Sequence, residues 1–215
     1  MFGNKLSYSS EHTTRGWNHF LESPVIYNFW QQITGAESWK HRVINEYVKP
    51  FRNARILDVG CGTASILQNF DPDLKVDYVG CDINSEYINH AKKKYSNKGN
   101  FFCCSADNLP TKENNFDFVL AIAVFHHLSD DTLENLIRLI KNKLKIGGIF
   151  ILSEPVWTKN QSRLEKYLMK KDRGQNIKSE EEYIKLVKKE FTNIKSIIVL
   201  DSHLIPWSVN VIISC

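Results

Sequence analysis

The 215-residue sequence has no apolar run long enough to cross a membrane. Its longest run, Phe118 to Phe125, is far shorter than the ~18 residues that a spanning helix needs. The N-terminal segment also lacks the charged-then-apolar layout of a signal peptide. We therefore expect no membrane insertion and a cytoplasmic location.

Cysteine is scarce and shows no ligand pattern. The five cysteines form no CxxC motif and have no nearby histidine at metal-ligand spacing: Cys61, Cys81, Cys103, Cys104 and Cys215. A chain of this length buries roughly 70% of its unfolded surface, so it does not need disulfides to fold. The sequence predicts reduced thiols and no metal site.

A basic tract is also missing, although the net charge is +4. Lysine and arginine are scattered along the chain in company with acidic residues. This distribution argues against a dedicated nucleic-acid partner and favours a small-molecule substrate.

Strand-like and helix-like patterns alternate along residues 51–215, which is typical of a parallel sheet flanked by helices. The last two strands, joined by a short segment with Pro206, are expected to form an antiparallel hairpin at a sheet edge. A capping box, Ser179 and Glu182, opens a late helix. The predicted strands are 55–59, 76–81, 100–104, 116–121, 148–153, 194–200 and 208–213, and the predicted helices between the first five are 63–70, 85–95 and 133–144.

Residues 1–50 are rich in aromatic side chains and form a separate N-terminal segment. Trp39, Val43 and Tyr47 step by four along a predicted helix. We expect this segment to be a helical extension that folds as a lid, with Tyr27 and Trp30 over the ligand crevice. The alternative is that these rings form a small satellite core.

The segment RILDVGCGTA, residues 55–64, runs from a strand through a glycine turn toward a helix. Gly60 and Gly62 permit a tight turn and close approach of a nucleotide-like ligand. Ser65 stands where the nicotinamide fingerprint needs its third glycine, which weakens a dinucleotide interpretation. Asp58, at the carboxyl edge of the strand, favours a cationic group such as an ammonium or sulfonium.

Five segments in order resemble the class I S-adenosylmethionine-dependent methyltransferases: ILDVGCGTA, YVGCDIN, SADNLP, FDFVLAIAVFHHL and LKIGGIFILSEP. They cover about residues 40 to 155, and Ala64 replaces the usual last glycine of the first motif. The resemblance implies a single α/β domain over residues 51–215. Its fold would be a Rossmann-like, doubly wound, mostly parallel seven-stranded sheet with helices on both faces and the antiparallel hairpin at its C-terminus. It also implies S-adenosylmethionine as the methyl donor, with an oxygen, nitrogen or carbon acceptor.

The cofactor contacts begin at the glycine loop, where Gly60, Cys61 and Gly62 are expected to lie against the ligand. Asp82 ends the second strand, 22 residues after Gly60. An acidic side chain at this place accepts hydrogen bonds from both ribose hydroxyls. Ile83 is then expected to pack on the adenine face.

The other cofactor contacts rest on the resemblance. Ser105 stands where the family usually has an aspartate for the adenine amino group, so Asp107 is the expected substitute, with an Asx turn as the alternative. The N–H group of Ala106 is expected to meet an adenine ring nitrogen. The carbonyl of Ala121 is expected to accept from the methionine ammonium.

Methyl transfer is an in-line displacement that depends mainly on alignment of the reactants. A hydroxyl or carbon acceptor also needs a general base. His126 and His127 follow the fourth strand and Glu154 follows the fifth, so these are the catalytic candidates, with His127 favoured. The alternatives are packing or hydrogen-bonding roles for the two histidines and a polar turn for Glu154.

An insertion between Pro155 and Ser179 follows the fifth strand on the ligand side. Its charges favour an acidic or phosphorylated substrate, although a solvated face is the alternative. The residues concerned are Arg163, Lys166, Tyr167, Lys170, Lys171, Asp172, Arg173 and Gly174.

Three other functions compete with a small-molecule methyltransferase. A nicotinamide-dependent oxidoreductase shares the fold class, but Asp58 and the absent third glycine argue against it. A non-catalytic protein that binds S-adenosylmethionine would show binding without turnover. An RNA methyltransferase favours a base-holding motif after the fourth strand, where this chain has AIAV.

Overall fold

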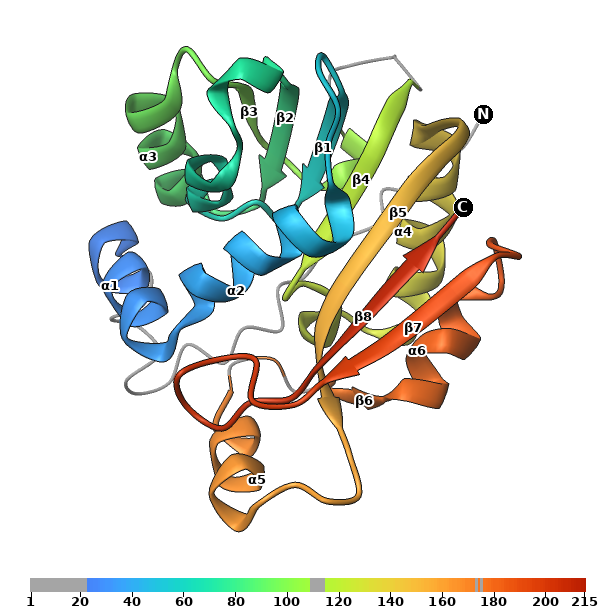
Figure 1. Ribbon diagram of the computed structural model, residues 1–215. Coiled ribbons are helices and arrows are strands. Elements are labelled where there is room, and N and C mark those ends of the chain that lie inside the picture. Colours follow the sequence, from blue (N-terminus) through green and yellow to red (C-terminus); the bar gives the residue numbers. More distant parts are fainter. Residues whose placement is uncertain (1–22, 109–114, 173, 175) are drawn as a thin grey trace.

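The computed structural model describes residues 23–108, 115–172, 174 and 176–215 (Figure 1). The side chains of Tyr27, Trp30 and Asp107, and all of Arg173, lie outside this description. The predicted lid contacts of the two aromatic rings and the predicted adenine contact of Asp107 therefore stay predictions.

One eight-stranded sheet forms the centre of the molecule. The first five strands of the chain pair with one another in parallel. The last strand of the chain pairs in antiparallel fashion with the fifth strand on one side and with the strand before it on the other. The predicted mostly parallel sheet with a C-terminal antiparallel hairpin is thus confirmed. The order is β3 (Asn100–Cys103), β2 (Asp77–Asp82), β1 (Arg55–Val59), β4 (Phe116–Ile122), β5 (Leu144–Trp157), β8 (Val209–Ser214) and β7 (Ile194–Val199), and β6 (Lys178–Ser179) pairs with β5.

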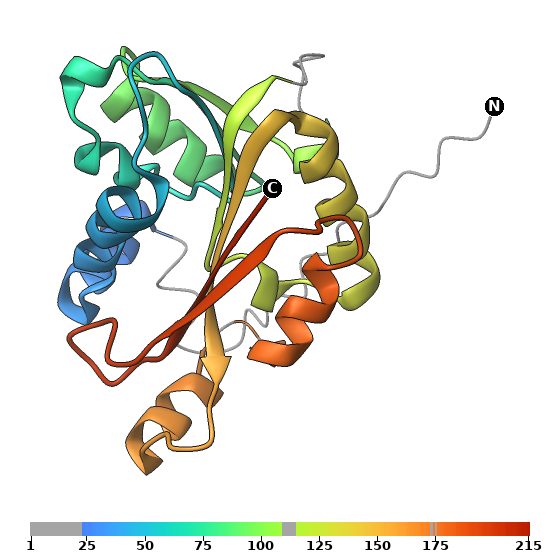
Figure 2. The same cartoon turned by 45° about the vertical axis from the view of Figure 1, so that its right-hand side comes forward.

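Helices cover both faces of this sheet (Figure 1, Figure 2). Their starts follow local sequence signals: Asn84 accepts hydrogen bonds from two backbone N–H groups of the next helix, and the predicted capping box of Ser179 and Glu182 is present. The α-helices are α1 (Pro24–Thr34), α2 (Ala36–Arg42), α3 (Ser85–Tyr95), α4 (Asp130–Lys143), α5 (Arg163–Lys170) and α6 (Glu180–Val187), and a π-helical segment, η2 (Val43–Val48), continues α2. The 3-10 turns are η3 (Ser65–Asn69), η4 (Pro72–Leu74), η5 (Ala106–Asn108) and η6 (Phe125–His127).

Two boundaries differ from the sequence prediction where they affect the site. The helix predicted at 63–70 is only the 3-10 turn η3, because Ala64 just before it has a left-handed backbone with φ 55°. The fifth strand is longer than predicted and reaches Trp157, so Glu154 lies inside β5 rather than in a turn after it.

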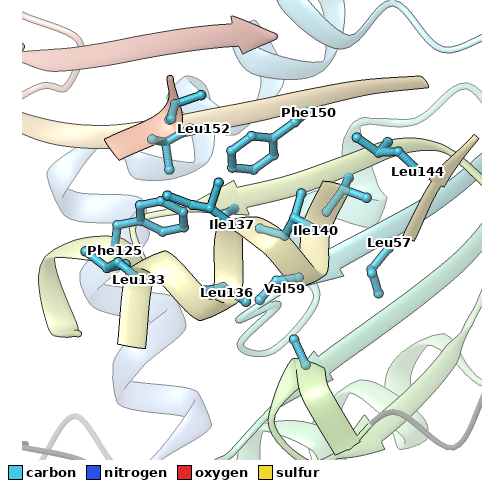
Figure 3. Close-up of a cluster of buried hydrophobic side chains, with 14 of the residues drawn as sticks. Leu57, Val59, Phe125, Leu133, Leu136, Ile137, Ile140, Leu144, Phe150 and Leu152 are labelled. Carbon is cyan, nitrogen blue, oxygen red and sulfur yellow. The ribbon is translucent and has the colours of Figure 1, made fainter. Parts of the chain in front are cut away.

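A hydrophobic cluster joins α4 and α6 to one face of the sheet. Figure 3 shows side chains of α4 interleaved with those of the central strands, among them Ile137, Phe150 and Leu152. Burying each such side chain contributes about 1.5–3 kcal/mol. A second cluster, with Trp39, Ile56 and Ile88, packs α2 and α3 on the other face, so the strand ends between the two clusters are held rigidly.

The described N-terminal helices meet the loop between β7 and β8 near the carboxyl ends of the parallel strands (Figure 1, Figure 2). The N–H group of Leu204 in that loop donates to the carbonyl of Thr34 at 2.9 Å. The indole N–H of Trp39 donates to the hydroxyl of Ser153 on β5 at 3.0 Å. Across the described ranges, no helix is both long enough and apolar enough to span a bilayer.

Candidate active site

A cavity of about 80 Å³ lies at the carboxyl edge of the parallel strands. Three parts of the chain enclose it: the glycine loop after β1, the ends of β4 and β5, and a roof made by α1, α2 and the β7–β8 loop. Its lining consists of Gln31, Ala36, Trp39, Lys40, Asp58, Gly60, Cys61, Ile66, Ile122, Ala123, Ser153, Glu154, Pro155, His203, Trp207 and Val209. This is the edge at which open α/β sheets bind their ligands.

The glycine loop is fastened to the end of β2. The N–H groups of Gly60 and Cys61 both donate to the carbonyl of Cys81, at 2.8 and 3.0 Å. Gly60 has φ 71°, and a Cβ atom there would lie 2.4 Å from Cγ2 of Val124. Glycine is therefore required here by both backbone conformation and packing, which keeps the loop close to the cavity.

Asp82 is the last residue of β2, as the sequence predicted, and it lies beside the glycine loop. Its Oδ2 atom accepts a hydrogen bond from the N–H of Gly62 at 2.9 Å, and its Oδ1 accepts from the N–H of Asn84 at 2.8 Å. These bonds orient an acidic acceptor at the end of β2, where a vicinal diol would be recognised. The next side chain, Ile83, is 47% exposed, so its apolar surface is accessible to a ligand.

The segment predicted to contact adenine is only partly described. Ala106 is buried at the start of η5. The hydroxyl of Ser105 accepts from the side-chain amide of Asn108 at 3.0 Å. Ser105 is thus engaged within its own turn.

Asp58 is a buried carboxyl group in the cavity wall, 4% exposed. The hydroxyl of Tyr78 donates to its Oδ2 at 2.6 Å. Burial raises the pKa of Asp58 to about 7, against the lowering effects of the Tyr78 hydrogen bond and the charge of Lys40. Near neutral pH this group therefore titrates, and a cationic ligand in the cavity would favour its ionised form.

Glu154, His126 and Asp172 form a charged network in which Glu154 and His126 are buried and Asp172 is half-buried. The Nδ1 atom of His126 is 2.6 Å from Oε2 of Glu154, and its Nε2 atom is 3.2 Å from Oδ1 of Asp172. Burial alone would lower the pKa of His126, but the two carboxylates outweigh it and raise this pKa to about 9. Glu154 Oε1 also accepts from the N–H groups of Val124 and Phe125, at 2.7 and 2.8 Å. This network therefore fixes the loop after β4.

The ring of His127 lies against that of His126, with centroids 4.1 Å apart and planes tilted by 40°. Of the three predicted catalytic residues, only Glu154 lines the cavity within the described part of the chain. Potential metal-ligand atoms of His126, His127 and Asp172 lie within 4.8 Å of one another. Both ring nitrogens of His126 face carboxylates, so the contacts described for this cluster are those of an ion-pair network.

Ala121, whose carbonyl was predicted to accept from the methionine ammonium, is not the last residue of its strand. Ala121 is fully buried inside β4, which continues to Ile122, and it does not line the cavity among the described residues. Ile122 and Ala123 line it instead. Ala123 has φ 57°, and its N–H donates to the carbonyl of Ser153 at 2.8 Å, so the chain turns sharply at the cavity edge.

Sequence reasoning missed Lys40, which binds the roof to the glycine loop. Its ammonium donates to Oε1 of Glu37 at 3.0 Å and to the hydroxyl of Ser65 at 2.6 Å, and it also bonds Gln31. A lysine one position after Trp39 carries no signal of this role in the sequence. It depends on α2 lying across η3, which only the fold decides.

Sequence reasoning also missed Ser153, His203 and Trp207. Ser153 adjoins Glu154, which was a candidate, so the end of β5 gave a partial signal. His203 and Trp207 lie in the hairpin loop, which the sequence placed only at a sheet edge.

The polar groups of this site fit S-adenosylmethionine. Asp82 provides carboxylate acceptors for a diol, while the buried Asp58 provides a counter-charge for a cation. The glycine loop follows Asp58 in the sequence, and its backbone is hydrogen-bonded to Cys81 and Asp82 at the end of β2. The loop therefore connects the two carboxylates. All five cysteines are free, in agreement with the predicted thiols.

Comparisons with known proteins agree with this geometry. Residues 56–148 match the family described as a methyltransferase domain. The chain is 30% identical over 110 residues to N-terminal Xaa-Pro-Lys N-methyltransferase 1-A of Xenopus laevis, which is 48% of each protein. It is 35% identical over 112 residues to the tRNA (carboxymethyluridine(34)-5-O)-methyltransferase of Arabidopsis thaliana, 49% of this chain and 24% of that protein. The matched part is thus at most about half of these relatives.

The fold extends over more of the chain than the sequence similarity does. A TehB-like SAM-dependent methyltransferase from Corynebacterium glutamicum superposes with a TM-score of 0.62 and 17% identity, covering 88% of this chain and 95% of that one. At this identity the likeness shows the fold alone. Residues 56–148 thus match a methyltransferase domain, and the chain around them has the fold of a SAM-dependent methyltransferase.

Proposed function

We propose that this protein transfers a methyl group from S-adenosylmethionine to a small-molecule acceptor. The observation that carries the proposal is the hydrogen bond between Gly62 and Asp82. It joins a glycine loop to an acidic strand end beside a cavity whose wall contains the buried Asp58. A bound S-adenosylmethionine supplies a methyl group on a sulfonium, which is already activated for displacement.

The chain's own residues bind and orient the reactants. Asp82 accepts hydrogen bonds from the ribose hydroxyls, and Ile83 packs on the adenine with the N–H of Ala106 at a ring nitrogen. Gly60, Cys61 and Gly62 approach the ligand with their backbone. The Asp58 carboxylate stabilises the cationic end of the ligand. Asp107 stays the proposed partner of the adenine amino group.

The methionine end of the ligand is proposed to meet the backbone at the end of β4. The strand end predicted at Ala121 lies one residue further on, so the carbonyls of Ile122 and Ala123 are the nearest candidates to the cavity. Holding donor and acceptor in line at this edge is the main catalytic contribution of such a site.

The predicted catalytic residues take different parts in this proposal. Glu154 forms part of the cavity wall, and His126 holds it through their 2.6 Å contact. Both are therefore positioning residues. His127, the general base favoured from the sequence, is outside the cavity lining among the described residues, so we do not assign it this role in the proposal.

A small acceptor is favoured by the roof over the cavity. Trp39, Lys40 and the β7–β8 loop close the site with hydrogen bonds to Ser153, Ser65 and Thr34, so a bulky macromolecule has little access to it. The basic residues of α5 lie beyond the carboxyl end of β5 (Figure 1), which keeps an acidic acceptor within the proposal. The free thiols fit a reducing, cytoplasmic environment.

Isothermal titration calorimetry tests the first part of the proposal. The protein is expected to bind S-adenosylmethionine and S-adenosylhomocysteine and to show no saturable binding of NAD. Saturable NAD binding without a response to S-adenosylmethionine would reject the assignment. Formation of S-adenosylhomocysteine with a panel of hydroxyl, amine and carbon acceptors then separates an enzyme from a protein that only binds the cofactor. RNA and peptide samples in the same panel test the macromolecular alternatives.

A further inference from the structure

His203 is a third histidine of the site, and it lines the cavity directly. It lies in the loop between β7 and β8, next to Ser202. The hydroxyl of Ser202 is 2.7 Å from Nδ1 of His203 and 2.8 Å from the carbonyl oxygen of Trp207. These two distances determine which nitrogen of the imidazole carries the proton.

A serine hydroxyl has one hydrogen to donate. The carbonyl of Trp207 can only accept, so the hydrogen of Ser202 points to it. Ser202 must then accept from His203, which places the imidazole proton on Nδ1. The Nε2 atom is left with a lone pair, and within the described ranges no protein group donates a hydrogen bond to it.

The ring is held in this orientation by its surroundings. The indole of Trp39 stacks on it with centroids 6.4 Å apart and planes at 28°, and the indole of Trp207 lies 6.1 Å away on a tilted plane. Leu204 fastens the same loop to Thr34. Burial lowers the pKa of His203 to about 4, helped by the charge of Lys40, so the ring is neutral at physiological pH.

The cavity has two chemically different ends. Asp58, Gly60 and Cys61 form the end next to the glycine loop, which is the donor side in the proposed function. Pro155, Val209 and the β7–β8 loop form the other end. At this end Trp39 and Trp207 provide aromatic walls.

Most of the polar groups there are already engaged. The hydroxyl of Ser153 accepts from Trp39, and Glu154 is bonded by backbone N–H groups and His126. Among the described residues at this end, Nε2 of His203 keeps a lone pair that these contacts leave for a ligand.

We propose that the methyl acceptor is a hydroxyl group on an aromatic ring, which binds in a subsite between Trp39 and Trp207. This hydroxyl donates its hydrogen bond to Nε2 of His203. This inference rests on the proposed function and deepens it by naming the acceptor class. As the new C–O bond forms, the C–S bond of the donor breaks, its electron pair stays on sulfur, and the hydroxyl proton passes to Nε2 and from there to solvent. A weak base suffices, because an oxygen that has gained a methyl group holds its proton only weakly.

Phenol and benzene are the probes that test this subsite without knowledge of the natural acceptor. Calorimetry first measures S-adenosylhomocysteine binding, and each probe is then titrated into the saturated protein. The wild type is expected to prefer phenol, because its hydroxyl meets Nε2. In His203→Phe the ring remains but the acceptor is lost, so the preference is expected to fall about tenfold, as for one hydrogen bond.

Matched variants separate the hydrogen bond from packing. His203→Gln places an amide oxygen near the position of Nε2 and is expected to keep part of the phenol preference. His203→Asn reaches only the position of Nδ1 and is expected to lose it. The exposed His41→Phe on α2 serves as the control and is expected to behave as wild type.

Nitrogen NMR of the histidine rings gives a second readout, with His203 assigned by comparison with His203→Gln. The proton is expected on Nδ1, and a proton on Nε2 would overturn the proposal. Equal phenol preference in wild type and His203→Phe, or no binding of either probe, would also overturn it. Failure of S-adenosylhomocysteine to bind the wild type rejects the proposed function itself, so the two failures are distinguishable.

Discussion

The Nδ1 atom of His126 and the Oε2 atom of Glu154 lie 2.6 Å apart, and the two side chains are 3% and 0% exposed. Asp172 approaches the other nitrogen of the same ring. One imidazolium thus pairs with two carboxylates from segments that are far apart in sequence. Removing either the imidazolium of His126 or the carboxylate of Glu154 would leave the other charge buried without compensation.

Replacing His126 is expected to destabilise the protein. His126→Gln leaves Glu154 and Asp172 without their counter-charge, so the free energy of unfolding should fall by about 3–5 kcal/mol. Urea denaturation followed by circular dichroism measures the change, with the exposed His41→Gln as control. A loss below about 1 kcal/mol would contradict the ion-pair assignment.

The same contact predicts a pH dependence of stability. The pKa of His126 is about 9 in the folded protein and near 6.5 in the unfolded chain. The stabilisation of the folded state by protonated His126 is therefore fully present below pH 6.5 and is lost as the pH rises through 9. Between pH 6.5 and 9.5 the wild type should lose up to about 3 kcal/mol more than His126→Gln. Parallel slopes for the two proteins in urea titrations would show that His126 does not carry the charge.

Asp58→Asn is expected to stabilise the unliganded protein while weakening S-adenosylmethionine binding. Because burial raises the pKa of Asp58 to about 7 from an ordinary 3.8, folding is favoured most below pH 3.8, and this advantage is lost as the pH rises through 7. The gain from Asp58→Asn should therefore be largest, about 1–3 kcal/mol, at pH 8 and smaller at pH 5. Thermal unfolding at both pH values measures it, with exposed Asp73→Asn as the reference. A gain that is equal at both pH values would mean that Asp58 is not strained by its burial.

Asp82→Ala is expected to weaken S-adenosylhomocysteine binding. Charge-assisted hydrogen bonds to a ribose contribute about 1.5–3 kcal/mol, which corresponds to a tenfold to hundredfold rise in Kd. Calorimetry on Asp82→Ala and on the exposed Glu86→Ala gives the comparison, and circular dichroism checks that both are folded. An unchanged Kd in folded Asp82→Ala would show that the ribose binds elsewhere.

Lys40→Met is expected to loosen the roof of the cavity. The change removes the hydrogen bonds that tie α2 to Ser65 and to Gln31 of α1, so hydrogen exchange over residues 24–42 should become faster. Cofactor affinity should fall by about tenfold, in line with the loss of one or two such bonds. Lys92→Met, on the exposed side of α3, is the control. Unchanged exchange rates in Lys40→Met would mean that Trp39 and Thr34 hold the roof without it.

The general-base prediction for His127 has a quantitative signature. A base supplies about 10²- to 10⁴-fold in turnover, so His127→Ala would lose that much if it acts directly. Because its ring lies outside the cavity lining of the described residues, we expect a loss below tenfold with cofactor affinity preserved. Turnover measurements with an identified acceptor decide between the two, and a loss of hundredfold or more would restore His127 as the base.

The sequence by itself determined the succession of strands and helices along the chain and the candidate residues around the glycine loop. Gly60, Gly62 and Asp82 are recognisable because their roles depend on short-range features: a strand, a tight turn and the next strand end. The capping signals at Asn84 and Ser179 are local in the same way. Local patterns failed at Ala64, where a left-handed residue replaces the first turn of the expected α-helix.

Only the tertiary structure decided the other half of the site. Trp39 and Ser153 are 114 residues apart and share a hydrogen bond, and His203 meets Trp39 from the far end of the chain. These contacts exist because β8 inserts beside β5 and carries its loop under α1 and α2. Strand order and loop docking depend on the packing of the whole sheet, so no periodicity in the neighbourhood of His203 indicates them.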